Sequence, residues 1–324
     1  MDGIIIINKP KNCTSHDIVR KAKKILNEKV GHTGTLDPNA TGVLPLLIGK
    51  GTQISKYIIN HDKTYEAVLQ LGEKTDTADI EGEVIETKTV DSKCLEAKFI
   101  EQTLKALEGE QEQVPPMYSA IKIHGKKLYE YARKGEKVEI EPRKIEIYSL
   151  ELININEANK QIEFRVSCSK GTYIRTLCEN IAEKLGTVGY MKELKRTQVG
   201  EFKIEDAITI EELMKKQTCI TIENYFRQNK NINLNEKKLQ LFLNGVQLTW
   251  PLPDGVYKVY SNEHFIGIGT VKNNLLKRDI IIRTSKGGWK NGKILYNNTN
   301  ILSKWKISYR NSIHNSISRH NKTI

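Results

Sequence analysis

The distribution of apolar and polar residues predicts strands in the N-terminal part of the chain. Residues 3–8 (GIIIIN) form a short apolar run, and residues 43–48 (VLPLLI) form a second one. In residues 65–71 and 162–168, apolar and polar side chains alternate. A short continuous apolar run is typical of a buried strand, and alternation is typical of a strand with one exposed face. We therefore expect these four segments to belong to a sheet.

Apolar residues at helical spacing predict three helices. The first begins at Thr14 or Ser15, both of which are good N-cap residues, and runs to about Asn27. The second covers Phe99–Leu107. The third covers residues 174–186, where the final glycine favours a helix end. Together with the strands, these helices predict a domain that contains both types of element.

The pattern changes near Asn231. Residues 256–260, 265–271 and 280–282 are short strand-like segments separated by turn residues, which is typical of a small barrel. After about Ser285 the chain becomes rich in Asn, Ser and Lys and the patterning fades, so we expect a largely disordered tail. We therefore divide the chain into residues 1–230, 231–285 and 286–324.

The net charge of +12 is unevenly distributed. From Arg283 to the end there are nine Lys or Arg and no Asp or Glu, which leaves 42 basic against 39 acidic side chains in residues 1–282. Each basic cluster alone fits a solvated helix face, but together the clusters fit a surface that meets phosphates. These clusters are Arg20, Lys21, Lys23 and Lys24; Lys122, Lys126 and Lys127; Arg133 and Lys134; Arg143 and Lys144; and Lys192, Lys195 and Arg196.

Several classes of protein are disfavoured by the sequence. The five cysteines lack CxxC spacing, which favours reduced thiols in a cytoplasmic protein over a disulfide framework or a zinc site. The apolar runs near the start are too short to span a membrane. Residues 49–52 (GKGT) resemble the end of a phosphate-binding loop, but the full motif is missing. We therefore expect no membrane segment, no bound metal and no nucleotide cofactor.

Residues 31–45 (GHTGTLDPNATGVLP) hold a single acidic residue, Asp37, among glycines, threonines and prolines. These residues exclude a helix and are too polar for a buried strand, so we expect a constrained loop. One interpretation of Asp37 is structural, because Asp-Pro favours turns and an Asp side chain can cap turn amides. The other is that the loop presents a reactive carboxylate.

Arg175 is expected in the first turn of a helix, after a loop that contains Gly171. An arginine there opposes the helix dipole, so it is not placed to stabilise the helix. Arg175 is then either a plain surface charge or the partner of an acidic group. A contact with Asp37 would explain both residues, because a guanidinium favours an ionised carboxylate and a bidentate pair would fix its orientation.

Further motifs follow in a fixed order along roughly the first two hundred residues. They are Gly3–Pro10 (GIIIINKP), Gly31–Pro38 (GHTGTLDP) with Ala40–Gly42, Lys63–Tyr65, Leu71–Gly72 with Thr75–Thr77, Pro116–Ala120, Gly125–Arg133 and Ser169–Thr176. Any one of them would be a weak signal, but a series in order is specific. On these motifs the chain resembles the tRNA pseudouridine synthase B (TruB) family.

The resemblance implies an α+β catalytic domain with a central mixed, mostly antiparallel sheet flanked by helices, followed by a small PUA-like β-barrel that binds RNA. It implies an isomerase that converts uridine in RNA to pseudouridine. The N1–C1′ bond breaks, the uracil turns, and C5 rejoins the sugar without any cofactor. The usual target in the family is uridine 55 in the T loop of tRNA. The expected partner is therefore the tRNA T-arm, and the protein is expected to act as a monomer.

The resemblance also assigns roles to individual residues. Asp37 is the implied catalytic residue, acting as a nucleophile at the sugar or the base, or as a base at the sugar. The implied substrate-binding residues are Tyr65, which stacks on the flipped base; His32, which occupies the space that the base leaves; Tyr173 and Leu194, which line the uracil pocket; Arg175, which holds Asp37 as a carboxylate; and Lys9 and Lys122, which face phosphates or the pocket rim. For His32 and Leu194 an ordinary structural role stays open.

Two other functions fit parts of the sequence. A non-catalytic tRNA-binding protein or tRNA folding chaperone on the same scaffold would use the basic clusters, but it would not need an acidic residue facing RNA. A hydrolase that uses Asp37 would need a second carboxylate as acid or base, and no motif of similar quality supplies one.

Overall fold

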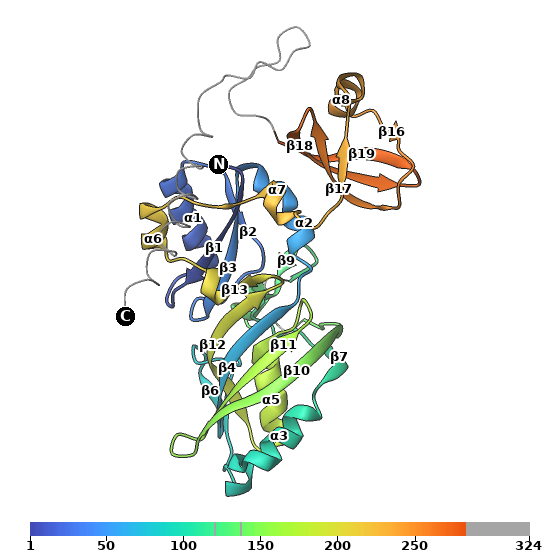
Figure 1. Cartoon of the computed structure of the whole chain (residues 1–324). Helices are drawn as coiled ribbons and strands as arrows, with labels where there is room; N and C mark the ends of the chain where they lie inside the picture. Colours follow the sequence, from blue (N-terminus) through green and yellow to red (C-terminus); the bar gives the residue numbers. More distant parts are fainter. Residues whose placement is uncertain (120, 137, 283–324) are drawn as a thin grey trace, which may run out of the picture. The chain divides into compact units, whose positions relative to one another are not determined.

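The structure is a computed structural model that describes residues 1–119, 121–136 and 138–282 (Figure 1). The segment 286–324, for which the sequence predicts disorder, lies outside the described residues. None of the helices in the described ranges is long and apolar enough to cross a membrane.

The larger sheet has ten strands and is almost entirely antiparallel. The one parallel ladder among its described pairs joins β3 and β12, so the predicted mixed, mostly antiparallel sheet is confirmed. In spatial order the main path is β14 (Ile220–Thr221), β1 (Gly3–Lys9), β3 (Thr41–Ile48), β12 (Gly189–Val199), β4 (Lys63–Leu71), β11 (Gln161–Cys168), β10 (Arg143–Asn156) and β7 (Gly109–Gln113). Two short strands lie off this path, β2 (Val30–His32) on β3 and β13 (Phe202–Lys203) on β12.

Helices pack against each half of this sheet. Helices α1 (Ser15–Leu26) and α6 (Ile210–Lys215) cover β1 and β3 through one apolar core. Helices α3 (Ala97–Lys105) and α5 (Ile174–Lys184) pack on β4, β11 and β10 through a second core (Figure 1). The halves meet between β3 and β12, where only Lys195↔Thr41 and Arg196↔Gly42 are paired.

Helix α1 begins with an N-cap, as the sequence predicts. Thr14 is its N-cap, and its hydroxyl accepts a hydrogen bond from the Asp17 amide at 3.1 Å. The Asp17 carboxylate accepts one from the Thr14 amide at 3.0 Å, which completes a capping box. Asn27 ends the helix in the left-handed conformation, with φ 52°.

The strands and helices predicted from the pattern are present, with ends shifted by a few residues. Two long strands of the central sheet, β10 and β12, are absent from the prediction. Both contain register shifts against their neighbours, which interrupt strict alternation. In β12 the residues Lys192, Lys195 and Arg196 also suggest an exposed basic surface, and Arg196 is in fact buried.

Short elements connect the main ones. The hairpins are β5 (Glu73–Thr75) with β6 (Val84–Thr87), and β8 (Lys122–Ile123) with β9 (Lys126–Lys127). The short helices are α2 (Ser55–Ile58), α4 (Leu128–Ala132) and α7 (Ile222–Tyr225), with 3₁₀ turns at Gly49–Ile54, Ser92–Leu95 and Ile204–Asp206. The basic segment from Lys122 is thus a hairpin followed by α4, between β7 and β10.

A second sheet of five strands begins at Asn231. Its spatial order is β15 (Asn231–Asn233), β17 (Gly255–Ser261), β18 (His264–Lys272), β19 (Leu275–Ile281) and β16 (Leu248–Thr249). Helix α8 (Glu236–Leu243) lies between β15 and β16 in the chain and contributes Leu239 and Phe242 to the buried residues. The curled sheet agrees with the predicted small PUA-like barrel, which completes the predicted α+β fold (Figure 1).

Candidate active site

The segment that carries Asp37 is a loop only in its middle. Residues 30–32 form β2, and residues 41–48 form β3, so the irregular part covers residues 33–40. The prediction of a loop over all of residues 31–45 is therefore wrong at both ends. Pro45 lies within β3 opposite Ile6, and its carbonyl accepts a hydrogen bond from the Thr33 amide at 3.3 Å.

Three buried side chains from distant elements hold this loop. The Ser15 hydroxyl, at the start of α1, accepts from the Leu36 amide at 2.9 Å and donates to the Leu36 carbonyl at 3.2 Å. The Lys9 ammonium group donates to the Pro38 carbonyl at 3.0 Å, next to Asp37. Arg196 donates to the Gly34 carbonyl at 3.0 Å. The backbone on both sides of Asp37 is therefore fixed.

Lys9 does not lie where the sequence suggests. It is 0% exposed, and its three donors go to the carbonyls of Pro10, Cys13 and Pro38 at 2.8–3.0 Å. Burial lowers the pKa of Lys9. The prediction that Lys9 faces phosphates or the pocket rim is wrong, because a buried amine with all its donors used cannot reach RNA.

The structure brings Asp37 and Arg175 together. Nε of Arg175 lies 3.3 Å from Oδ2 of Asp37. The Arg175 side chain is 7% exposed, so it is not a plain surface charge, whereas the Asp37 side chain is 40% exposed and open to a ligand. The pair meets through one nitrogen and not through the bidentate fork that we expected. Among the described contacts, the Asp37 side chain caps no turn amide.

The remaining donors of Arg175 are occupied on its far side. Nη2 donates to the Tyr118 carbonyl at 2.8 Å, and Nη1 donates to the Thr77 carbonyl at 3.3 Å. Nη1 also lies 3.6 Å from Oδ2 of Asp79. Asp79 is itself fixed, since Oδ1 accepts from the Thr77 hydroxyl at 2.7 Å. The guanidinium is thus a rigid bridge from Asp79 to Asp37.

A small pocket of about 110 Å³ opens beside this pair. Five of the eight predicted site residues line it, namely Asp37, Tyr65, Tyr173, Arg175 and Leu194. Thr35, Leu36, Thr172, Ile174 and Met191 complete the lining. The pocket therefore joins one carboxylate and one guanidinium to two aromatic rings and an apolar wall.

Tyr65 and Leu194 reach the pocket from neighbouring strands. Tyr65 is on β4 and Leu194 is on β12, and both also belong to the apolar core under α5. Leu194 therefore packs in the core and also lines the small pocket, and its contact with uracil stays a prediction. Burial raises the pKa of the Tyr65 hydroxyl, so it stays protonated at neutral pH.

Two predicted residues do not line the pocket. His32 ends β2, and its Nδ1 is buried without a hydrogen-bond partner in the described residues. Burial lowers the pKa of His32, which keeps the ring neutral at pH 7. Lys122 is exposed in the β8–β9 hairpin. Their predicted roles toward RNA stay predictions.

Comparison with known proteins identifies the family. The model for the N-terminal domain of TruB family pseudouridylate synthases matches residues 22–174, and the model for the tRNA pseudouridylate synthase B C-terminal domain matches residues 175–230. The chain belongs to the TruB family of pseudouridylate synthases. The TruB resemblance seen in the motifs is thereby confirmed.

Individual relatives agree with this assignment. A protein from Bacillus cereus named tRNA pseudouridine synthase B is 48% identical over 231 residues, covering 70% of this chain and 75% of that protein. A protein of the same name from Clostridium kluyveri is 43% identical over 284 residues, covering 84% and 96%. A chain in the structure of an H/ACA RNP bound to a substrate RNA containing 2′-deoxyuridine has a TM-score of 0.59 at 22% identity, over 87% of this chain and 85% of that one, which shows a shared fold.

Two residues that support the pocket of this TruB protein, Gln113 and Asp79, are absent from the sequence prediction. Gln113, at the end of β7, accepts from the Tyr173 amide at 2.8 Å and donates to the Tyr173 carbonyl at 3.1 Å. It therefore fixes the backbone just before Arg175. Asp79 follows the Thr75–Thr77 motif by two residues, and this proximity is the signal that could have found it. Gln113 carries no comparable signal.

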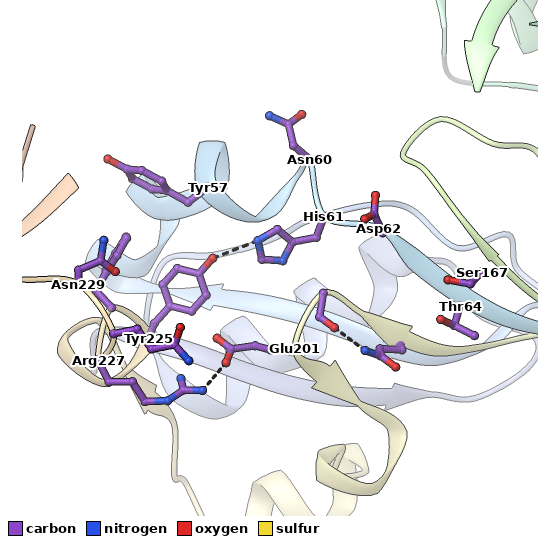
Figure 2. A pocket seen from close by; sticks show the side chains of 14 residues that line it. Tyr57, Asn60, His61, Asp62, Thr64, Ser167, Glu201, Tyr225, Arg227 and Asn229 are labelled. Atoms are coloured by element: carbon purple, nitrogen blue, oxygen red, sulfur yellow. Dashed lines mark hydrogen bonds and ion pairs between the residues drawn. The ribbon is translucent and has the colours of Figure 1, made fainter. Parts of the chain in front are cut away.

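A larger depression, of about 690 Å³, contains none of the predicted site residues. The Tyr225 hydroxyl lies 3.4 Å from Nε2 of His61, and Arg227 pairs with Glu201 at 2.5 Å. Figure 2 shows both contacts as dashed lines. Thr64 lines this depression, and its neighbour Tyr65 lines the small pocket, so β4 contributes to both. Size alone does not identify the active site of this TruB synthase. The small pocket is the candidate active site, because it contains Asp37 and Arg175.

Proposed function

We propose that this protein isomerises uridine 55 in the T loop of tRNA, with Asp37 as the catalytic residue and no cofactor. The observation that supports the proposal most strongly is the Asp37–Arg175 contact, 3.3 Å long, at the mouth of a pocket lined by Tyr65 and Tyr173. Membership of the TruB family and relatives named tRNA pseudouridine synthase B support the choice of tRNA.

The reaction exchanges one bond for another within the nucleoside. The N1–C1′ bond breaks, the freed uracil turns, and a C5–C1′ bond forms. The hydrogen at C5 leaves as a proton, and N1 gains a proton. Asp37 acts on the nucleoside in its ionised form, as nucleophile or as base. Its partly exposed side chain is accessible to the sugar of an entering nucleotide.

The other pocket residues bind and orient the base. Eversion of a base from its stack costs a few kcal/mol, and stacking on an aromatic ring offsets part of that cost. Tyr65 supplies the ring, and His32 takes the space left in the RNA. Arg175 is too buried and too fully bonded to follow the substrate, so its role is to hold Asp37 in place and to keep negative charge favourable there.

The T loop suits the charge pattern of the surface. RNA loops are recognised by shape, splayed bases and phosphates, and exposed lysines supply the phosphate contacts. Lys122 and Lys126 lie on the hairpin between β7 and β10, and Lys23 and Lys24 lie in the last turn of α1. We assign these side chains to the RNA backbone.

One assay tests the proposal. A T-arm RNA with tritium at C5 of uridine 55 is incubated with the pure protein and nothing else, and pseudouridine is then mapped at nucleotide resolution. We expect tritium release into water and a single modified position. A matched RNA with cytidine at that position is the control. Binding without tritium release, or modification elsewhere in the loop, would contradict the proposal.

A further inference from the structure

Arg196 is a fully buried cation beside the active site. It is 1% exposed and lies on β12, two residues after Leu194. Nε donates to the Val43 carbonyl at 2.8 Å, and Nη2 donates to the Gly34 carbonyl at 3.0 Å. The sequence placed Arg196 in a basic cluster that meets phosphates, and the structure contradicts this. The guanidinium instead joins Gly34, near the start of the Asp37 loop (residues 33–40), to Val43 in the strand that follows the loop.

The backbone around Arg196 is packed as closely as the side chain. Gly42 pairs with Arg196 across the seam between β3 and β12, and a Cβ on Gly42 would lie 2.1 Å from the Arg196 carbonyl oxygen. A Cβ on Gly34 would lie 3.3 Å from Nη1 of Arg196, and Gly34 has φ +82°. Glycines therefore allow the loop to fold directly onto this arginine.

Arg196 also lies beside Tyr65, which lines the pocket. On the other side of β12 it is in register with Tyr65 of β4, the ring that we assign to the flipped base. Facing residues in such a pair project from the same face of the sheet. Burial raises the pKa of Tyr65, and the positive charge of Arg196 opposes this effect. Arg196 thus joins the Asp37 loop through its side chain and the strand of the stacking ring through its place in the ladder.

The charge of Arg196 is not neutralised by a neighbour. Within the described ranges no carboxylate lies within 4.0 Å of its guanidinium, and its side-chain hydrogen bonds go to the carbonyls of Gly34 and Val43. A buried charge without a counter-charge is strongly disfavoured, and an apolar side chain of similar length would fill the space. Stability alone therefore does not explain an arginine here.

We propose that Arg196 is a positioning residue that links the Asp37 loop to Tyr65 and so fixes the distance between the carboxylate and the stacked base. This inference rests on the proposed function. An error of about 1 Å in that distance is enough to slow a reaction about 100-fold, so a rigid link has a direct effect on rate. RNA affinity, which arises from exposed cations, does not depend on it.

The test compares Arg196→Met and Arg196→Lys with Arg165→Met as a matched control. Arg165 lies on β11 of the same sheet and pairs with Glu66 at 2.9 Å, away from the loop. For each protein we would measure the unfolding free energy, the RNA dissociation constant and the single-turnover rate at saturating RNA. We expect Arg196→Met to lower the rate about 100-fold with an unchanged dissociation constant, Arg196→Lys to recover part of it, and Arg165→Met to match wild type.

One further measurement separates positioning from a general loss of structure. Amide hydrogen exchange should rise in residues 33–40 of Arg196→Met and stay unchanged in Arg165→Met.

The outcomes distinguish the two proposals. If wild type releases no tritium from any uridine, the proposed function fails, while the exchange data still test the link. If wild type is active but Arg196→Met slows the reaction only as much as its folded fraction falls, the link is disproved. Unchanged exchange in residues 33–40 of that variant would also disprove it.

Discussion

The position of the Asp37 carboxylate depends on the contacts of one guanidinium, that of Arg175. Arg175 has five N–H groups in a rigid fork, and the structure directs them to Asp37, Asp79 and two carbonyls. Because Nη1 and Nη2 are bound to Asp79 and the two carbonyls, the guanidinium cannot move, and its Nε holds Asp37 in one place. A lysine could not make these contacts at once, since it presents a single point charge.

Arg175→Ala and Arg175→Lys should therefore both lose turnover. We expect a fall in kcat of about 10²–10³-fold for Arg175→Ala, as for the removal of a preorganised charge partner. Arg175→Lys should lie close to Arg175→Ala and far from wild type. The assay is single-turnover isomerisation of a T-arm RNA, with Arg165→Ala as the control. Wild-type turnover in Arg175→Ala would show that the buried pair has no catalytic role.

At this scale the sequence predicts the grouping of Asp37, Tyr65 and Arg175 but not the surroundings of Lys9 and Arg196. Asp37, Tyr65 and Arg175 lie within recognisable motifs, and the structure gathers them in one pocket. Lys9 and Arg196 look like RNA contacts because sequence shows a charge but not its partners. Their partners are carbonyls of residues 10–43, which the fold brings to them.

At the scale of elements, helix α1 serves two purposes with adjacent residues. Thr14 caps the helix, and Ser15 bonds the backbone of Leu36 in the Asp37 loop. The cap is visible in the sequence as a local pattern, whereas the Ser15–Leu36 contact spans 21 residues and is not. The same limit explains why β12, interrupted by two register shifts, was not predicted.

These adjacent residues allow a paired prediction. Thr14→Ala should lower the unfolding free energy by about 1 kcal/mol and leave kcat unchanged, because only the helix cap is lost. Ser15→Ala should lower kcat more than stability explains, because both Leu36 hydrogen bonds disappear. Chemical denaturation and single-turnover rates measure the two effects. Equal kcat in the two variants would contradict a positioning role for Ser15.

At the scale of the whole molecule, charge is divided between the described part and the C-terminal residues. Residues 1–282 carry 42 basic and 39 acidic side chains, whereas residues 283–324 carry nine basic and no acidic ones. The fold class follows from the motif series, since pattern alone predicts a strand–helix mixture but not which strands are neighbours. The seam between β3 and β12, which positions the loop, joins residues about 150 positions apart.

Deletion of residues 286–324 should change affinity but not specificity. Each Lys or Arg that neutralises a phosphate steepens the fall of log affinity with log salt, by about 0.7–0.9 per contact. We expect the truncated protein to show a shallower salt dependence and the same modified nucleotide. Binding isotherms at several salt concentrations and pseudouridine mapping measure the two. A changed modification site would show that these residues take part in target selection.

The central claim is that Asp37 performs the isomerisation inside the pocket that Arg175 completes. The most direct measurement is the single-turnover rate of tritium release from C5 of the target uridine by Asp37→Asn, with RNA affinity measured on the same preparation. We predict no detectable release and an affinity within a few-fold of wild type, because the amide keeps the shape of the carboxylate but neither its charge nor its nucleophilicity. Release at a rate near that of wild type would contradict the account.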